Sequence, residues 1–463
     1  MMSARQENSR TLASAIGVTD DHAVALLDAS VLLTVAAGEE RLATRIRELL
    51  QRTLPNVVTD VDASKRPAVE ILVGRTAARS SAPVIGVNVS GYKFAVRDGQ
   101  VASSGQEPAA HTIVELLAAC YAAAAAVHRA TEAELPMPIR LPIEVDLAAL
   151  LGTDVECLHQ PVDLGTVFMA GAGAIGNGVL LGFSAFDVHG DLHVCDPDTV
   201  TPGNLNRCVW FTADDLGAYK AERLVVHAQP HVPRLRLVAH GCVLKDVPVA
   251  KQGGAWLDKL IIAVDSRRVR RALQNEMPHH VFDASTTGIA EVVLHFNSLP
   301  SSHACLSCVY YEAPDETAHE AHVAESLGVA VADVRSNFVT VEAARAIASR
   351  YPELVPETLV GLAYDSLFKQ LCGQGALKTE ADRQVLAPFA FVSVLAGVLL
   401  AVELVRRVHR GSTELPFNYW RVSPWSAPVA RMRELRPKRT TCEFCDNPVL
   451  QGIVRELWDG HGE

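Results

Sequence analysis

The chain has 463 residues, of which 49% are hydrophobic and 21% charged, a balance typical of a folded protein with room for two or three domains. Its formal net charge of −11 argues against a nucleic-acid-binding protein, because such proteins hold phosphates with an excess of Lys and Arg. The opening MMSARQENSRTL lacks the apolar core of a secretion signal, so we expect a cytoplasmic protein whose ten cysteines stay reduced.

Residues 1–140 predict an α/β domain that carries no glycine-rich phosphate loop. The segments AVEILVGRT, from Ala68, and APVIGVNVSGYKFAVRDGQ, from Ala82, are typical of strands, with a hairpin turn expected at Asp98–Gly99. An alanine-rich helix is predicted from His111. The proline-rich ELPMPIRLP, from Glu134, is the expected linker to a second domain over residues 141–463.

The second domain is predicted to be α/β, with a doubly wound, mostly parallel, Rossmann-like sheet. Buried strands are expected at Val167–Ala170, in DLHVCDPD, in KLIIAVDS and in HHVFDASTTG, and helical segments alternate with them. The apolar run from Phe389 is too short to cross a bilayer and is interrupted by Glu403. We therefore expect it to be a buried helix of a protein that does not span a membrane.

A glycine-rich turn follows the first of these strands. Gly171, Gly173 and Gly176 fit the spacing G-x-G-x-x-G between a strand and a helix, where backbone N–H groups and the helix N-terminus bind phosphate. Asp196 lies 20 residues after Gly176, at the end of the next strand, where a carboxylate accepts hydrogen bonds from ribose hydroxyls. These features predict a nucleotide site, but a dehydrogenase and an adenylate-forming enzyme share them.

The residues after this aspartate favour adenylation. Asp198 is followed by Asn204 and Arg207 in NLNR and by Lys220 in GAYKA. Hydride transfer needs no cations beside the phosphates, whereas attack on the α-phosphate of ATP builds negative charge that Arg and Lys stabilise. Asp265, at the end of a buried strand, is well placed to hold a Mg²⁺ ion that bridges phosphates.

The ordered motifs GAGAIG, DPD, NLNR, GAYKA and VDSRRVRR resemble the activating enzymes of ubiquitin-like proteins, the ThiF/MoeB superfamily, over residues 140–450. The resemblance implies ATP- and Mg²⁺-dependent adenylation of the C-terminal carboxylate of a ubiquitin-fold protein, by an enzyme that forms a homodimer. It assigns the main chain of Gly173 and Ala174 to ATP, Asp196 to ribose and Asp265 to Mg²⁺. The whole nucleotide site then comprises Gly171, Gly173, Ala174, Gly176, Asp196, Asp198, Asn204, Arg207, Lys220, Asp265 and Ser266.

The chain departs from the superfamily at two positions. Cys208 stands where Gln is common after NLNR, and Ser266 stands where Asn is common after the magnesium aspartate. Neither change removes a charge, so we expect adenylation to persist. Arg270 matches a further basic position of the superfamily. Members also borrow an arginine from a partner subunit or pseudo-subunit, and the candidates for that arginine are Arg5 and Arg10.

Two C-x-x-C pairs predict a four-thiolate zinc site. Cys305 and Cys308 form the first pair, and Cys442 and Cys445 form the second. The pairs are far apart in the sequence, so the site must close in the folded chain and would hold the C-terminal tail to the adenylation domain. A redox pair is the alternative, but neither pair opens a helix directly after a strand.

The segment 312–386 is predicted to be a mostly helical insertion. It holds one cysteine, Cys372, with Lys369 one turn before it and glycines after it. In the resembling enzymes this region carries the catalytic cysteine or crosses over the active site, so Cys372 is the first candidate nucleophile for a thioester, and Cys208 is the second. The alternative is a cysteine buried on an apolar helix face.

Together these features predict an enzyme that activates a ubiquitin-like protein and passes it to a conjugating enzyme. The motifs resemble bacterial enzymes of this kind that serve antiviral defence. The N-terminal domain is expected to be a degenerate adenylation half or a docking surface for the conjugating enzyme. The alternatives are activation of a sulfur-carrier protein or peptide precursor, an NAD-dependent oxidoreductase, and a non-catalytic scaffold.

Overall fold

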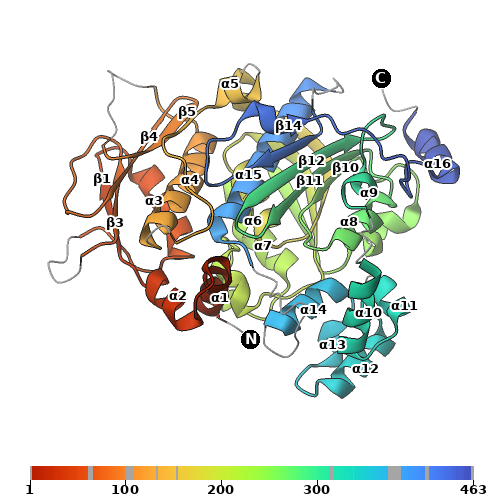
Figure 1. Ribbon diagram of the computed structural model, residues 1–463. Coiled ribbons are helices and arrows are strands. Elements are labelled where there is room, and N and C mark those ends of the chain that lie inside the picture. The colour runs from red at the N-terminus through yellow and green to blue at the C-terminus, as the bar shows by residue number, and fades with distance from the viewer. Residues whose placement is uncertain are drawn as a thin grey trace.

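The computed structural model describes residues 3–60, 66–100, 108–131, 134–152, 155–311, 316–336, 338–373, 387–411 and 417–459. Residues 31–146 contribute one sheet and residues 162–434 a second, and helices lie between them (Figure 1). Helix α4 (Thr112–Ala130) packs on the first sheet, α15 (Ala390–Arg410) and α6 (Ala174–Phe183) pack on the second, and α15 contacts α4. The mixed α/β fold class is therefore confirmed.

The N-terminal sheet has the order β2-β1-β3-β4-β5-β6, with parallel pairing from β2 to β4 and antiparallel pairing from β4 to β6. Its strands are β1 (Val31–Val35), β2 (Val57–Val58), β3 (Val69–Val73), β4 (Val84–Ser90), β5 (Lys93–Asp98) and β6 (Ile143–Asp146). Ser90 pairs with Lys93, so the β4–β5 turn lies at Gly91–Tyr92, where Gly91 has φ 53°. The hairpin turn predicted at Asp98–Gly99 is wrong, because Asp98 pairs with Ile85 at the end of β5.

Helices cover this sheet and lead away from it. They are α1 (Ala4–Ile16), α2 (Asp20–Leu27), α3 (Glu40–Gln51), α4 and the short α5 (Leu147–Leu151). Helix α4 is the alanine-rich helix predicted from His111, which caps its N-terminus. It is long and apolar enough to pass the length test for a membrane span, but 94% of its apolar window is buried inside the protein. A buried helix in a protein core passes the same test, so α4 is only weak evidence for a membrane-spanning helix.

The second sheet has the order β14-β13-β12-β11-β10-β7-β8-β9 and is parallel from β11 to β9. Its strands are β7 (Val162–Ala170), β8 (Val188–Cys195), β9 (Leu235–His240), β10 (Lys259–Ile262), β11 (His280–Thr287), β12 (Glu291–Ser298), β13 (Tyr419–Val422) and β14 (Arg433–Glu434). The carboxyl ends of β7, β8 and β10 meet at one edge, where ligands bind in doubly wound sheets. Helices α7 (Lys220–Ala228) and α8 (Arg267–Gln274) follow strands of this sheet.

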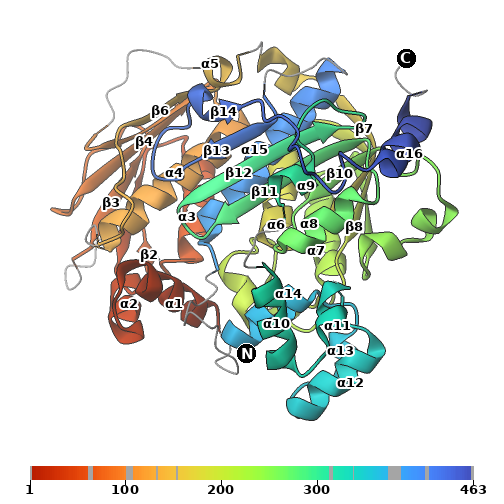
Figure 2. The same ribbon diagram turned by 45° about the vertical axis from the view of Figure 1, so that its right-hand side comes forward.

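A helical insertion stands apart from both sheets in the two views (Figures 1 and 2). Its helices are α10 (Glu316–Leu327), α11 (Val331–Arg335), α12 (Val341–Arg350), α13 (Pro356–Leu359) and α14 (Tyr364–Gly373). They enclose a small apolar core of their own, which includes Val323, Leu327, Ile347 and Phe368. The short helix α9 (Leu306–Val309) precedes the insertion, and α16 (Pro448–Trp458) ends the described chain.

Helices α6 and α15 cross at glycines. A Cβ atom on Gly397 would lie 2.4 Å from the carbonyl carbon of Gly178 and 2.4 Å from the nitrogen of Val179. A Cβ on Gly182 would lie 2.7 Å from Cβ of Ala401. Because backbone atoms fill the position at Gly397 and the Ala401 side chain fills the one at Gly182, any larger side chain must push the two helices apart.

We predict that Gly397→Val destabilises the protein by at least about 1–3 kcal/mol, the usual cost of overpacking a filled core. Thermal or denaturant unfolding measures the change. The matched control is Gly452→Ala in α16, where a Cβ meets no atom of the described residues within 4 Å. Equal stability of the Gly397→Val variant and the wild type would contradict the close crossing.

Candidate functional site

The glycine turn joins β7 to α6, and its three glycines serve different purposes. Gly171 has φ 102°, and a Cβ there would lie 2.7 Å from the Ala263 carbonyl oxygen at the end of β10. A Cβ on Gly176 would lie 2.4 Å from the Gly171 oxygen, so packing requires both glycines. At Gly173, the N-cap of α6, a Cβ would meet no described atom within 4 Å. The turn is thus open where backbone N–H groups can receive an anion.

Asp196 connects the glycine turn to the end of β8. Its two carboxylate oxygens accept hydrogen bonds from the Ala172 N–H at 2.7 Å and from the Asp198 N–H at 2.9 Å. The residue is only 7% exposed, and this burial raises the pKa of Asp196 to about 6, although Lys220 opposes the shift. The Asp196 carboxylate therefore connects the glycine turn to the turn after β8. These are the two turns that the sequence predicts to bind the nucleotide.

Lys220 begins α7 and reaches back to the same turn. Its Nζ lies 2.6 Å from Asp198 Oδ2, and its N–H donates to the Asp198 carbonyl at 2.9 Å. Burial alone would lower the Lys220 pKa, but the negative charges of Asp198 and Asp196 raise it above its usual value. The ammonium group therefore keeps its charge in a largely buried position.

The NLNR segment forms the 3₁₀ helix Pro202–Asn206 and the residue after it. The side-chain oxygen of Asn204 accepts a hydrogen bond from the Thr201 N–H at 2.9 Å. Arg207 donates to the Gly203 carbonyl at 3.2 Å and to Asn206 Oδ1 at 2.8 Å. Both predicted phosphate-binding side chains thus also stabilise their own loop.

The N-terminal domain holds this loop from the other side, which the sequence did not reveal. The Arg52 guanidinium donates to the carbonyl oxygens of Leu205 at 2.7 Å, Val209 at 2.9 Å and Phe211 at 3.2 Å. Asn206 donates to Asn8 Oδ1 of α1 at 3.0 Å. Residues about 150 to 200 positions apart therefore set the loop that carries Arg207.

Helix α1 also brings charged groups to the loop. A Cβ on Gly203 would lie 3.0 Å from Glu7 Oε1, and burial raises the Glu7 pKa while Arg207 and Arg10 lower it. Of the two arginine candidates in this helix, Arg5 instead pairs with Asp28 at 2.5 Å on the exposed surface. Arg10 is thus the candidate that shares an environment with Arg207.

The segment after β10 carries the predicted magnesium ligand. Asp265 is exposed, whereas Ser266 is 2% exposed and caps α8 by accepting the Val269 N–H at 3.3 Å. Arg270, in the same helix, is 2% exposed and pairs with Asp283 of β11. It also donates to the Ala284 carbonyl at 3.0 Å, so Arg270 connects α8 to β11 in the protein interior.

The two C-x-x-C pairs meet in space. The Sγ–Sγ distances are 3.8 Å for Cys305–Cys308, 3.7 Å for both Cys305–Cys442 and Cys308–Cys445, and 3.4 Å for Cys305–Cys445. Four thiolates at about 2.3 Å from a tetrahedral zinc are about 3.8 Å apart, so the cluster fits this ion. None of the four is joined in a disulfide.

The two candidate nucleophiles, Cys372 and Cys208, lie in different parts of the fold. Cys372 belongs to the last turn of α14, but its side chain and that of Lys369 lie outside the described part of the structure. Cys208 is 1% exposed, and burial raises the pKa of its thiol despite the nearby Arg207, Lys220 and Arg52. A thiol of this kind is a poor nucleophile.

A glycine turn that is open at Gly173, a buried aspartate after the next strand, and a nearby Lys and Arg at the carboxyl edge of a parallel sheet are typical of nucleotide-binding α/β proteins. The ThiF family matches residues 160–444, and the E1 N-terminal domain matches residues 1–153. The chain belongs to the ThiF family, and its first 153 residues match the E1 N-terminal domain.

Individual relatives are more distant. An uncharacterized protein, y4jF of Sinorhizobium fredii, is 29% identical over 270 residues, which are 55% of this chain and 51% of that protein. The chain thus spans about half the length of this curated relative. Among solved structures, E. coli MccB is 18% identical over 61% of this chain and 65% of that chain, with a TM-score of 0.37. The complex of the microcin C7 biosynthetic enzyme MccB with N-formylated MccA is 16% identical over 61% and 67%, with a TM-score of 0.39.

We predict about one zinc ion per chain, held by the four clustered cysteines, in protein purified without added metal. Elemental analysis measures it. Cys445→Ser should lower the zinc content and the melting temperature, because the metal links α16 to the sheet domain. The matched control is Cys242→Ser, a cysteine outside the cluster, which should keep the zinc. A metal-free wild-type protein with full stability would contradict the site.

Proposed function

We propose that this protein uses ATP and Mg²⁺ to adenylate the C-terminal carboxylate of a ubiquitin-like protein. The observation that carries the proposal is the connection of the open glycine turn to Asp196, Asp198 and Lys220, with Arg207 on the adjoining NLNR loop. A dinucleotide oxidoreductase needs the turn and the aspartate but gains nothing from the two cations. Membership of the ThiF family supports the same reaction class.

The residues suggest a division of labour for this reaction. N–H groups at the start of α6 donate hydrogen bonds to phosphate oxygens, and the Asp196 carboxylate accepts hydrogen bonds from the ribose hydroxyls. The incoming carboxylate attacks the α-phosphorus, the bond to the bridging oxygen breaks, and pyrophosphate leaves. Arg207 and Lys220 stabilise the charge that develops on the phosphoryl oxygens, an effect worth about 2.7–4 kcal/mol for a well-placed donor. Mg²⁺, held by Asp265, would offset charge on the phosphates.

A second step follows in this proposal. The Cys372 thiolate attacks the acyl adenylate, AMP leaves, and the ubiquitin-like protein is held as a thioester for transfer to a conjugating enzyme. The position of Cys372 on a helical insertion separate from both sheets supports a mobile carrier role for that segment. We further propose that the protein is a cytoplasmic homodimer and serves a bacterial conjugation system of antiviral defence. This part of the proposal rests on the resemblance of the sequence motifs.

Adenylation should depend on Asp265. We expect Asp265→Ala to lower Mg²⁺-dependent ATP–pyrophosphate exchange by about two orders of magnitude or more, because the charge on the phosphates loses its counterion. The assay uses the purified protein with candidate ubiquitin-like proteins and, for comparison, short peptides. Asp214→Ala, an exposed acid elsewhere in the same domain, is the control and should exchange normally. Unchanged exchange by Asp265→Ala would rule out this site.

Thioester formation should depend on Cys372. With ATP and the ubiquitin-like protein, the wild type should give an adduct that thiol reductant cleaves on a gel. Cys372→Ala should lose the adduct and keep pyrophosphate exchange, because adenylation precedes thiol attack. Cys208→Ala is the matched control and should retain the adduct. An adduct that survives in Cys372→Ala would exclude this cysteine as the nucleophile.

A further inference from the structure

The carboxylate of Asp365 joins the insertion to the segment that carries Asp265. Asp365 lies in the first turn of α14, and its Oδ2 accepts a hydrogen bond of 2.6 Å from the hydroxyl of Ser266. Its Oδ1 forms an ion pair with the guanidinium of Arg268. Ser266 is the N-cap of α8 and Arg268 lies in its first turn, so one carboxylate contacts the start of that helix at two points.

The hydrogen bonds at Ser266 leave its hydroxyl one orientation. The hydroxyl has a single proton, which it donates to Asp365, while its oxygen accepts the Val269 N–H at 3.3 Å. Ser266 directly follows Asp265 in the chain. The direction in which the Asp265 side chain leaves the sheet edge is therefore linked to the position of Asp365.

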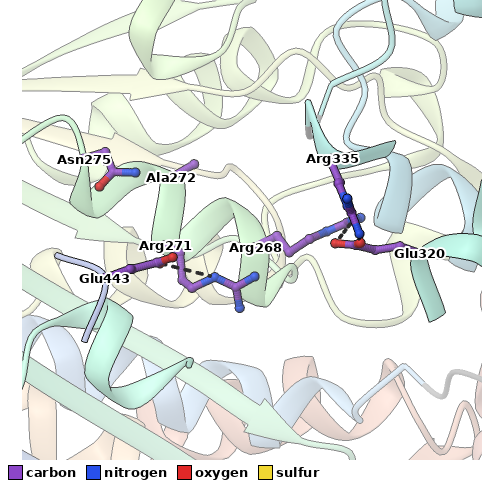
Figure 3. A pocket seen from close by; sticks show the side chains of 7 residues that line it. All are labelled: Arg268, Arg271, Ala272, Asn275, Glu320, Arg335 and Glu443. Atoms are coloured by element: carbon purple, nitrogen blue, oxygen red, sulfur yellow. Dashed lines mark hydrogen bonds and ion pairs between the residues drawn. The ribbon is translucent and has the colours of Figure 1, made fainter. Parts of the chain in front are cut away.

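Other contacts of the described residues also hold the insertion at this boundary, among them Lys245, whose Nζ lies 5.3 Å from the centroid of the Phe338 ring. Arg268 also forms an ion pair of 3.6 Å with Oε1 of Glu320 in α10. Nε of Arg335 in α11 donates to the other carboxylate oxygen of Glu320, Oε2, at 2.8 Å. Arg268, Glu320 and Arg335 line a pocket of about 440 Å³ that continues along α8 (Figure 3). The insertion core is separate from the cores of the sheets, and apolar contact across the boundary comes from Phe338 and Ala363.

A polar boundary with a cavity beside it behaves differently from a packed core. Arg268 is 6% exposed, so its charge requires an acidic partner in place. Asp365 supplies the closest one, and loss of that carboxylate leaves Arg268 with Glu320 at the longer distance. The docked position of the insertion and the conformation of the first turn of α8 are therefore coupled through Asp365.

We propose that Asp365 is a positioning residue for Mg²⁺ use: by holding Ser266 and Arg268 it keeps Asp265 in the orientation that binds the metal–nucleotide complex. This inference rests on the proposed adenylation function. It adds that nucleotide use depends on how the insertion, which also carries Cys372, is docked. An insertion that leaves α8 releases the first turn and weakens the metal site.

Titration of Mg²⁺ tests the proposal. The Mg²⁺ concentration needed for half-maximal ATP binding, measured by calorimetry without any protein substrate, should rise about 10-fold or more in Asp365→Ala, the usual effect of losing a residue that orients a metal ligand. Saturating Mg²⁺ should restore most of the binding, whereas general damage to the fold would not be relieved by the metal. Ser266→Ala should show the same shift, and Ser266→Thr, which keeps the hydroxyl, should restore the wild-type value.

The controls separate this proposal from the function on which it rests. Asp333→Ala removes a cap of α11 inside the insertion, where Asp333 accepts the Ala330 N–H at 3.0 Å, and should leave the Mg²⁺ requirement unchanged. If Asp365→Ala and Ser266→Ala bind ATP as strongly as the wild type and need the same Mg²⁺ concentration, the positioning role is wrong. That result would leave the proposed function standing. A wild type that binds no ATP at any Mg²⁺ concentration would overturn the proposed function and this inference together.

Discussion

The crossing of α6 and α15 at Gly178 and Gly397 is the contact on which the rest of the molecule depends. A Cβ atom on Gly397 would lie 2.4 Å from backbone atoms of α6, and one on Gly178 would lie 3.1 Å from backbone atoms of α15. Helix α6 begins at the glycine turn, and α15 also packs against α4 of the N-terminal domain and against β11 and β12. Since a close-packed interior transmits displacement, the nucleotide turn is held by the same layer that joins the two sheets.

The N-terminal domain contributes to the site through hydrogen bonds and not through a phosphate loop of its own. Arg52 is enclosed by three carbonyl groups of the NLNR region, and burial lowers its pKa although nearby negative charge opposes the shift. Without this guanidinium, those buried carbonyl oxygens would lose their partners, which costs about 1–3 kcal/mol for each such group. The loop that carries Arg207 therefore requires both domains for its conformation.

The sequence predicted those features whose physical cause is local. The strand pattern and the spacing of Gly171, Gly173 and Gly176 indicated the parallel sheet and its turn, because glycine spacing reflects backbone packing within one strand–helix unit. The two C-x-x-C pairs were recognisable from thiol spacing alone, and the structure brings them together. The β4–β5 turn was missed because Asp-Gly is the stronger hairpin signal, whereas strand register selected Gly91–Tyr92.

What the sequence could not reveal were partners from distant parts of the chain. Nothing near Ser266 indicates Asp365, 99 positions later, and nothing near Arg207 indicates Arg52 or Asn8. Each of these contacts satisfies a buried polar group whose choice of partner depends on tertiary structure. The roles of the residues named from motifs stay a prediction, while the groups that contact them became visible only in three dimensions.

The two cations at the site each have a partner within the protein. Lys220 binds Asp198, and Arg207 binds carbonyl and amide oxygens of its own loop. In the proposed reaction, a triphosphate competes with Asp198 for the Lys220 ammonium, which leaves the Asp198 carboxylate unpaired beside the buried Asp196. Two neighbouring carboxylates in a buried position repel each other, which a divalent cation or a proton can offset. Burial raises the pKa of Asp196 to about 6, and the negative charge of the neighbouring Asp198 contributes to the shift.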